Sequence, residues 1–280
     1  MKQFLKIFNF YLNSSIHVSL AVVALQLVSC ITLNIYYDKN LLFFTFFASI
    51  TGYNFIKYSS LAKWHHLSLT ETLRVIQVFS MLSFVAMLYF ISKLDVKVLI
   101  TCIALGSVTA LYALPIFSFK QDMSSERLTL RSLKGIKIYV IAIVWAGTAV
   151  LLPLFQAEEA VSWDAGILLV QLFLFVIVIT LPFDIRDVKY DAISIATIPL
   201  RVGVKKAKIV GVLLLILLLL LEALKDKITS DTFVSLLVIS ILSGVFLLIS
   251  SEKQSKYYAS FWVESIPLLW LILLYCINVY

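Results

Sequence analysis

Apolar residues fill most of this chain in long stretches that charged residues interrupt only briefly. A helix needs about 20 mostly apolar residues to cross roughly 30 Å of hydrocarbon. Stretches of that order recur from one end of the sequence to the other, and lipid leaves backbone groups no partner except within a helix. The pattern therefore predicts nine transmembrane helices, at residues 16–37, 41–57, 75–92, 97–118, 138–156, 165–183, 207–223, 232–250 and 260–279.

Composition agrees with this pattern. Of the 280 residues, 61% are hydrophobic and 14% are charged, and the mean hydropathy is +1.00. These values are typical of an integral membrane protein. We expect one all-α transmembrane domain over residues 1–280, a bundle of about nine helices with membrane lipids as its surroundings. No soluble domain or long polar tail is evident, so a nucleic-acid partner is not expected.

Lysine and arginine gather in alternate loops. Of the 23 basic residues, 18 lie at the N-terminus or in the connections after predicted helices two, four, six and eight, counting the adjoining helix ends. Because Lys and Arg accumulate on the cytoplasmic side, we expect the N-terminus and these loops in the cytoplasm. Nine crossings then place the C-terminus outside. Such a basic face also attracts anionic lipid headgroups. For any single Lys or Arg, this attraction together with membrane topology is a simpler explanation than binding of an anionic substrate.

Three acids mark the end of the sixth predicted helix. Asp184, Asp187 and Asp191 fall within about 60° on one helical face. Charge at the end of a membrane span is costly and tends to mark a site for an ion or a charged substrate, and carboxylates are the ligands that Mg²⁺ prefers. The alternative is a charge network with Arg186 and Lys189, although both are expected on other faces of the same helix.

This segment resembles the second signature of the UbiA superfamily of intramembrane prenyltransferases. In that family an Asp-x-x-Asp-x-x-x-Asp segment ends the sixth span and leads through Thr-Leu-Pro-x-x-x-Gly to the seventh. A basic Gly-Leu-Lys element precedes the family's fifth span. The matching residues here are Asp184, Asp187, Asp191, Thr197-Ile198-Pro199, Gly203, the segment Arg131-Ser132-Leu133-Lys134-Gly135-Ile136-Lys137, and Trp145.

The resemblance implies a transferase that moves a prenyl group from a prenyl diphosphate to an aromatic or other lipid-soluble acceptor. It implies Mg²⁺, which would bridge diphosphate oxygens and help the diphosphate leave. It also implies cations that neutralise the remaining oxygens. The metal ligands and catalytic acids would be Asp184, Asp187 and Asp191. The diphosphate-binding residues would be Lys137, Arg131, Lys134, Asn54, Lys57 and Arg201.

The family's first signature, Asn-Asp-x-x-Asp-x-x-x-Asp at the end of the second span, lacks its acids here. Asn54 matches the Asn, but Phe55, Tyr58 and Ala62 stand at the acid positions. We hypothesise that the Lys57 ammonium replaces the missing cation; alternatively it extends to the lipid headgroups. Three interpretations follow for the chain: an enzyme with one metal, a catalytically inactive relative that binds an isoprenoid lipid, or a protein outside this family.

Glu264 is the only acid more than a residue or so inside a predicted helix. Intramembrane carboxylates generally face a cavity or a partner. Two kinds of role stay open: a functional one, in which Glu264 lines the acceptor pocket or acts as a base, and a structural one, a buried bond to a neighbouring helix. A secondary transporter would be expected to show interrupted helices at matching places in two halves, and no such repeat is evident.

Overall fold

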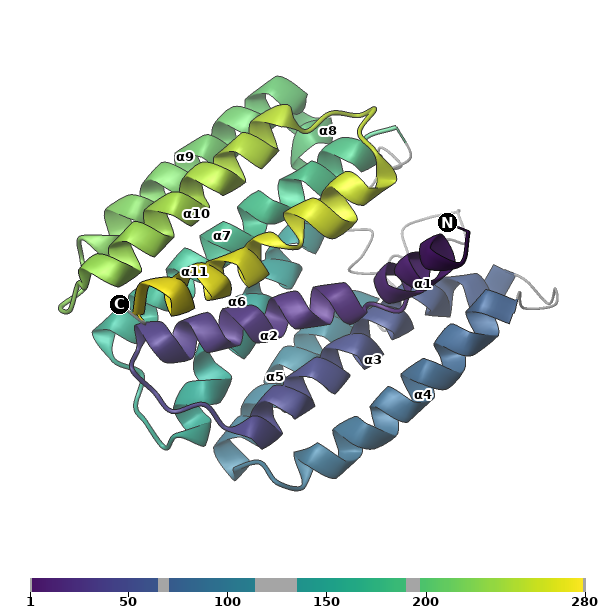
Figure 1. Cartoon of the computed structure of the whole chain (residues 1–280), viewed down its shortest axis with the longest axis horizontal. Coiled ribbons are helices and arrows are strands. Elements are labelled where there is room, and N and C mark those ends of the chain that lie inside the picture. Colours follow the sequence, from purple (N-terminus) through teal and green to yellow (C-terminus); the bar gives the residue numbers. More distant parts are fainter. Residues whose placement is uncertain (1, 65–70, 114–134, 190–196, 279–280) are drawn as a thin grey trace, which may run out of the picture.

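The computed structural model describes residues 2–64, 71–113, 135–189 and 197–278, and these form helices joined by short connections, without a strand among them (Figure 1). The helices are α1 (Lys2–Asn13), α2 (Ile16–Thr32), α3 (Lys39–Trp64), α4 (Glu71–Ile91), α5 (Val96–Ala113), α6 (Ile136–Gln156), α7 (Trp163–Asp187), α8 (Ile198–Val202), α9 (Val204–Glu222), α10 (Ser230–Ile249), the π-helix η2 (Tyr258–Val263) and α11 (Ile266–Asn278).

The expectation of an all-helical membrane protein is confirmed. Among the described residues, five helical segments are long and apolar enough to span a membrane: α4, α6, α7, α10 and the segment Tyr258–Ile277. A sixth is added if α1 and α2 form one bent span. The nine-span count is not confirmed, because α3 and α9 carry polar and charged residues in one half and the apolar part of α5 is short.

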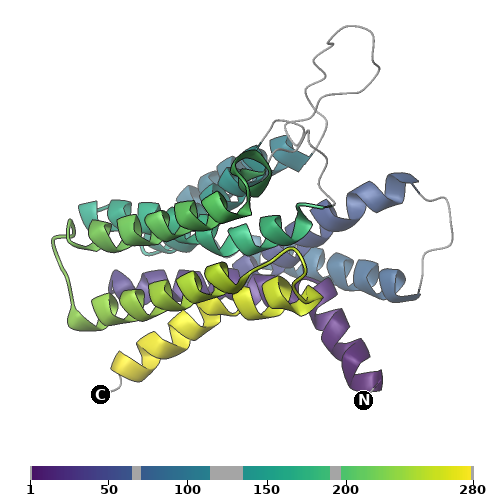
Figure 2. The same ribbon diagram turned by 90° about the horizontal axis from the view of Figure 1, so that it is seen from above.

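The helix α1 was not predicted from the sequence, because its 12 residues are too short and too polar to read as a span. It meets α2 at an angle of 53°, and Figure 2 shows it leaving the bundle obliquely. The break lies at Ser14 and Ser15, both buried, and Ser15 adopts the left-handed backbone conformation with φ 64°. A short polar side chain tolerates that conformation better than a branched one.

The helices α2, α6 and α7 form the centre of the bundle. The helix α6 packs on both α2 and α7, α3 and α11 lie against α2, α5 lies against α6, and α9 lies against α7 (Figure 1). In the most apolar 18-residue stretch of α7, 72% is buried inside the protein. Its N-terminus is capped by the Ser162 hydroxyl, which accepts from the Ala165 amide at 3.2 Å. A rigid, buried α7 therefore fixes the position of the acids at its C-terminal end.

Candidate functional site

Asp184 and Asp187 lie one turn apart at the end of α7, and each carboxylate contacts a cation. Asp184 is 1% exposed, and its Oδ1 lies 3.4 Å from Lys137 Nζ. Asp187 accepts from Arg186 Nε at 2.7 Å and from Arg186 Nη2 at 3.0 Å. A buried carboxylate requires such a partner, because its desolvation is otherwise costly.

The expectation that Arg186 points away from the acids is wrong for Asp187. The long arginine side chain folds back along the helix end, where its fork matches both oxygens of the neighbouring carboxylate. Lys189 instead forms an ion pair with Glu252, at 3.6 Å. The charge network considered as an alternative is thus present in part, while Asp184 takes its cation from another helix.

The segment between α10 and η2 holds the end of α7 in place. Gln254 Nε2 donates to the carbonyl oxygen of Pro182 at 2.9 Å. The ion pair of Glu252 with Lys189 adds a second link from the same segment. Because Pro182 lies only two residues before Asp184, these contacts orient the turn that carries the acids.

Lys137 reaches Asp184 from the start of α6. Gly135 precedes the helix with φ 80°, a left-handed conformation that glycine adopts without strain. The chain turns there, and Lys137 becomes the second helical residue. Arg131, Lys134 and Asp191, which the resemblance assigns to the same site, lie outside the described residues. Arg201 is exposed on the short helix α8 and lines neither of the two cavities described below.

At the end of α3, the residues that match the first UbiA signature hold the break between α1 and α2. Asn54 is 3% exposed. Its Nδ2 donates to the Ser14 carbonyl at 3.0 Å and to Ser80 Oγ at 2.8 Å, and its Oδ1 accepts from Ser15 Oγ at 2.7 Å. These bonds give Asn54 a structural task; its predicted contact with a diphosphate would require an exchange of partners.

Two further residues of this segment bind the same break. Lys57 Nζ donates to the Asn13 carbonyl at 3.1 Å, and Tyr58 Oη donates to that oxygen at 2.9 Å. Phe55, at another lost acid position, is 52% exposed and lines a cavity. The side chain of Ala62 lies outside the described residues. The end of α3 therefore supplies hydrogen-bond donors here where the resemblance expects carboxylates.

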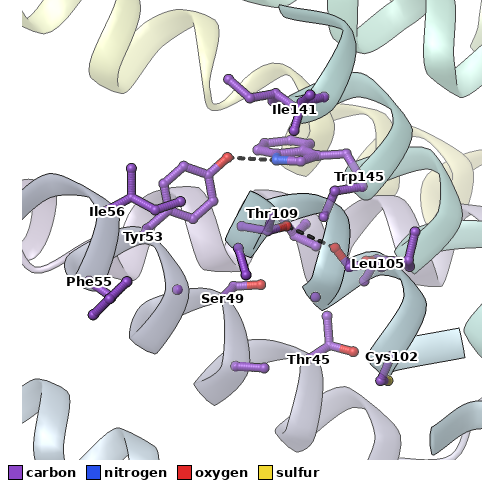
Figure 3. A pocket seen from close by; sticks show the side chains of 18 of the residues that line it. Thr45, Ser49, Tyr53, Phe55, Ile56, Cys102, Leu105, Thr109, Ile141 and Trp145 are labelled. Carbon is purple, nitrogen blue, oxygen red and sulfur yellow. Dashed lines mark hydrogen bonds between the residues drawn. The ribbon is translucent and has the colours of Figure 1, made fainter. Parts of the chain in front are cut away.

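An apolar cavity of about 560 Å³ lies between α3, α5 and α6 (Figure 3). Lys137 and Tyr53 line one end, and Phe44, Thr45, Cys102 and Leu152 line the other. Tyr53 Oη accepts from Trp145 Nε1 at 2.6 Å, so the two rings form a joined wall. The remaining lining is aliphatic, aromatic or hydroxylated. Such a space fits an elongated hydrocarbon whose polar end lies beside Lys137.

A second cavity, of about 1110 Å³, is polar. It lies among α1, the ends of α3 and α7, and the segment that leads into η2. Tyr53 and Ile56 line both cavities. Its charged lining residues among those described are Lys6, Lys57, Arg186, Lys256 and Glu264. The two cavities thus share a wall at Tyr53 and Ile56, and the polar one carries an excess of positive charge.

Glu264 follows η2 directly and faces the polar cavity. The buried bond to a neighbouring helix is not observed: within the described chain, no hydrogen bond or ion pair of its carboxylate occurs. Lys57 and Arg186 nevertheless interact with it electrostatically. A π-helix inside a longer helix often marks a functional position. Of the possible roles of Glu264, the structure therefore favours a place in the wall of the polar cavity over a bond to a neighbouring helix.

Magnesium fits the donor types at the end of α7. Mg²⁺ is usually held by one or two carboxylates together with phosphate oxygens and water, and Asp184 and Asp187 supply two such groups one turn apart. Within the described residues no cluster of three metal-ligating side chains occurs. A metal there would have to share Asp187 with Arg186 and take its remaining ligands from a bound phosphate group.

Sequence reasoning missed Lys6, Lys256 and Tyr53. Lys6 and Lys256 are 250 residues apart in numbering, and nothing in either local sequence joins them to one cavity. The amphipathic pattern of Phe4, Phe8 and Tyr11 in the first helix was the available signal for Lys6. In the structure the ring of Phe8 lies 5.3 Å from that of Tyr257 and 5.1 Å from that of Phe261, which joins α1 to η2 and the residue before it.

Comparison with known proteins supports the fold. No protein-family model and no curated protein matches the sequence. One solved structure is similar over 98% of this chain and 98% of its own, with a TM-score of 0.56 and 17% sequence identity. That structure comes from work giving structural and mechanistic insights into the biosynthesis of digeranylgeranylglyceryl phosphate synthase in membranes. The likeness spans the whole chain and shows a shared membrane-protein fold.

Proposed function

We propose that this chain is a UbiA-like prenyltransferase, which transfers a prenyl group from a prenyl diphosphate to an aromatic or other lipid-soluble acceptor. The observation that carries the proposal is the apolar cavity of about 560 Å³ with the Lys137–Asp184 ion pair at its polar end. An apolar tail joined to a multiply charged head matches that distribution of surfaces. The full-length likeness to a structure from work on digeranylgeranylglyceryl phosphate synthase supports the same class of reaction.

The donor would lie with its tail between α3, α5 and α6 and its diphosphate beside Lys137. That ammonium is 33% exposed at the side chain, so it remains accessible to a ligand while it contacts Asp184. Asp184 and Asp187, with Asp191, would hold Mg²⁺, and the metal would supply neutralisation of the leaving diphosphate. Arg131, Lys134, Asn54, Lys57 and Arg201 complete the proposed set of diphosphate ligands.

The reaction breaks the bond between the allylic carbon and the diphosphate oxygen, the diphosphate leaves with the bonding electrons, and a bond forms from that carbon to the acceptor, which releases one proton to the diphosphate or to water. Lys137 stabilises the departing negative charge without giving up a proton. Tyr53 and Trp145 present ring surfaces in the lining of the cavity, and aromatic faces attract a developing cation. The proposed orientation places this end and the N-terminus in the cytoplasm, with the C-terminus outside.

Binding of a labelled prenyl diphosphate, with and without Mg²⁺, tests the proposal in purified protein. Asp184→Asn and Asp187→Asn should each abolish metal-dependent binding, because an amide oxygen is a weaker ligand for a hard cation. Asp231→Asn, at the start of α10 and outside both cavities, is the matched control and should bind as the wild type does. A folded wild-type protein that binds no prenyl diphosphate of any chain length would refute the proposal.

One observation favours a second candidate, a catalytically inactive relative that binds an isoprenoid lipid. At one of the lost acid positions at the end of α3, Tyr58 holds the α1–α2 break, and Arg186 donates to both oxygens of Asp187. Saturable binding of an uncharged isoprenoid alcohol, without metal dependence and without turnover of a diphosphate, would distinguish this candidate from the enzyme.

A further inference from the structure

Serine and threonine side chains line the apolar cavity at four positions, and one of them is hydrogen-bonded within its own helix. Thr109 Oγ1 donates to the Leu105 carbonyl oxygen at 3.0 Å, as hydroxyls in helix interiors often do. Within the described parts of the chain, no hydrogen bond of the Thr45, Ser49 or Thr148 hydroxyl occurs. These three side chains therefore bring unused hydrogen-bonding capacity to an otherwise apolar wall.

Thr45 is the most deeply buried of the three. Its side chain points from α3 toward Cys102 of α5 (Figure 3), the residue is 1% exposed, and its Oγ1 has no partner in the described chain. Ser49 lies one turn further along α3, on the same face. A buried hydroxyl without a partner is costly, because no protein group replaces the hydrogen bonds that it made to water. A ligand that supplies a hydrogen bond at this place would remove that cost.

A buried amide on α2 has the same property. Gln26 is 0% exposed, and neither its Nε2 nor its Oε1 has a partner among the described residues. It lies one turn beyond Val22, which lines the cavity, so the two side chains share a face of α2. Gln26 is six residues before the end of α2, and Thr45 is six residues after the start of α3. Both positions are therefore about 9 Å from the α2–α3 connection, at the same depth.

This depth is far from the proposed diphosphate site. Thr148 is 11 residues beyond Lys137 on α6, about 16 Å along the helix. One turn after Thr148 comes Leu152, which shares a buried apolar cluster with Phe44, the neighbour of Thr45. The free hydroxyls of α3 and α6 thus lie near one level. The cavity is charged beside Lys137, and it offers hydrogen bonds again at its deep end.

We propose that Gln26, Thr45, Ser49 and Thr148 form a tail subsite, which binds a hydroxyl group near the far end of the prenyl chain. The inference rests on the proposed function and names its donor class, a prenyl diphosphate with a hydroxylated tail. A hydroxyl fits because it both donates and accepts, whereas Gln26 Oε1 only accepts and a ligand carbonyl has no proton to give it. A plain hydrocarbon leaves these groups unpaired, so the subsite discriminates against it.

Chains that differ in one hydroxyl test the tail subsite. Labelled farnesyl and geranylgeranyl diphosphates are compared with analogues that carry a hydroxyl on the last carbon, using the full-length protein in phosphatidylcholine nanodiscs. Without the subsite, the added hydroxyl would weaken binding because its desolvation is not compensated. We expect the hydroxylated chain of at least one length to bind at least about tenfold more tightly than its plain counterpart. Equal or weaker binding of both hydroxylated chains overturns the proposal.

Two substitutions of similar volume remove the hydrogen-bonding groups. Thr45→Val and Gln26→Met should each reduce the preference for the hydroxylated chain about tenfold. Thr51→Val is the matched control, because Thr51 lies on the same helix, donates to the Phe47 carbonyl oxygen at 2.8 Å and does not line the cavity. Thr45→Val should also unfold at the same or a higher temperature, since its hydroxyl has no partner to lose. A preference that survives both substitutions, or a lower midpoint in Thr45→Val, overturns the subsite.

Methyl ethers of the same chains separate the tail subsite from the diphosphate site. They carry no diphosphate, so the preference for the hydroxylated ether should appear in the wild type and persist in Lys137→Met. If no diphosphate binds while the hydroxylated ether is still preferred, the proposed function fails and the tail subsite stands. If the plain diphosphates bind and no hydroxylated probe is preferred, the tail subsite fails and the proposed function stands.

Discussion

If the apolar cavity holds the prenyl tail, a single substitution in its lining should change the affinity for long prenyl chains. Gly106 lies in the middle of α5 and lines the apolar cavity four residues from both Cys102 and Ala110, a separation of about 6 Å along the helix in each direction. A Cβ built at Gly106 has no neighbour within 4 Å. Gly106→Leu should therefore fold and place a branched side chain across the cavity.

The expected loss of binding free energy follows from the amount of hydrocarbon that the new side chain excludes from the cavity. An isoprene unit has five carbons, and burial is worth about 0.8 kcal/mol per carbon, so exclusion of one unit costs up to about 4 kcal/mol. That corresponds to at most about a thousandfold in affinity; partial repacking of the tail reduces it, and we expect about 100-fold. Dimethylallyl diphosphate, which has one isoprene unit, needs only the end beside Lys137. Its affinity should not change.

The assay is competition of prenyl diphosphates of increasing length against a labelled donor. Gly166→Leu in α7 is the matched control, because a Cβ at Gly166 also meets nothing within 4 Å and this residue lines neither cavity. Geranylgeranyl diphosphate should lose affinity for Gly106→Leu and keep it for Gly166→Leu. A loss that is the same for every chain length, or no loss at all, would show that the tail lies elsewhere.

Three further substitutions have defined outcomes. Lys137→Met should weaken prenyl diphosphate binding at least about tenfold in the same competition assay, since a charge-assisted contact is lost; unchanged affinity would place the diphosphate elsewhere. Lys225→Met leaves the 2%-exposed Glu222 without the ammonium at 2.6 Å and should lower the free energy of unfolding by about 3–5 kcal/mol, measured by thermal unfolding in detergent; an unchanged midpoint would contradict this. Tyr53→Phe removes the hydrogen bond from Trp145 and should cost about 1 kcal/mol, seen as a midpoint about 2–4 °C lower.

The helices could be predicted because lipid permits few alternatives. The apolar periods of α6, α7 and α10 begin and end within a few residues of the predicted ranges, and their ends carry ordinary signals such as Ser162 and Gly135. The helix α1 was not predicted because it is short and amphipathic. Its bend occurs at two serines, without the glycine or proline that usually marks a break.

The candidate site could be predicted only along one helix. The spacing of Asp184 and Asp187 places them on one face whatever the tertiary structure, and the basic start of α6 suggested Lys137 through a resemblance. The pairing of Arg186 with Asp187 depends on a rotamer, which helical spacing does not determine. The two cavities depend on the packing of α3, α5, α6 and α1, so Lys256 and the shared wall at Tyr53 carry no local sequence signal, and the amphipathic pattern around Lys6 indicates a helix but no cavity.

The lost acids at the end of α3 bear on how charge is balanced in the proposed reaction. Two carboxylates with a bound Mg²⁺ are close to neutral together, whereas Lys57 is positive without any acid to hold it. Lys57 also donates to the Asn13 carbonyl, so the α1–α2 break fixes the group that we propose as the replacement for the metal. An enzyme built this way would use one metal at the end of α7 and permanent cations opposite it. Its affinity for an anion would then persist in part when Mg²⁺ is removed, whereas a site with two metals would lose it.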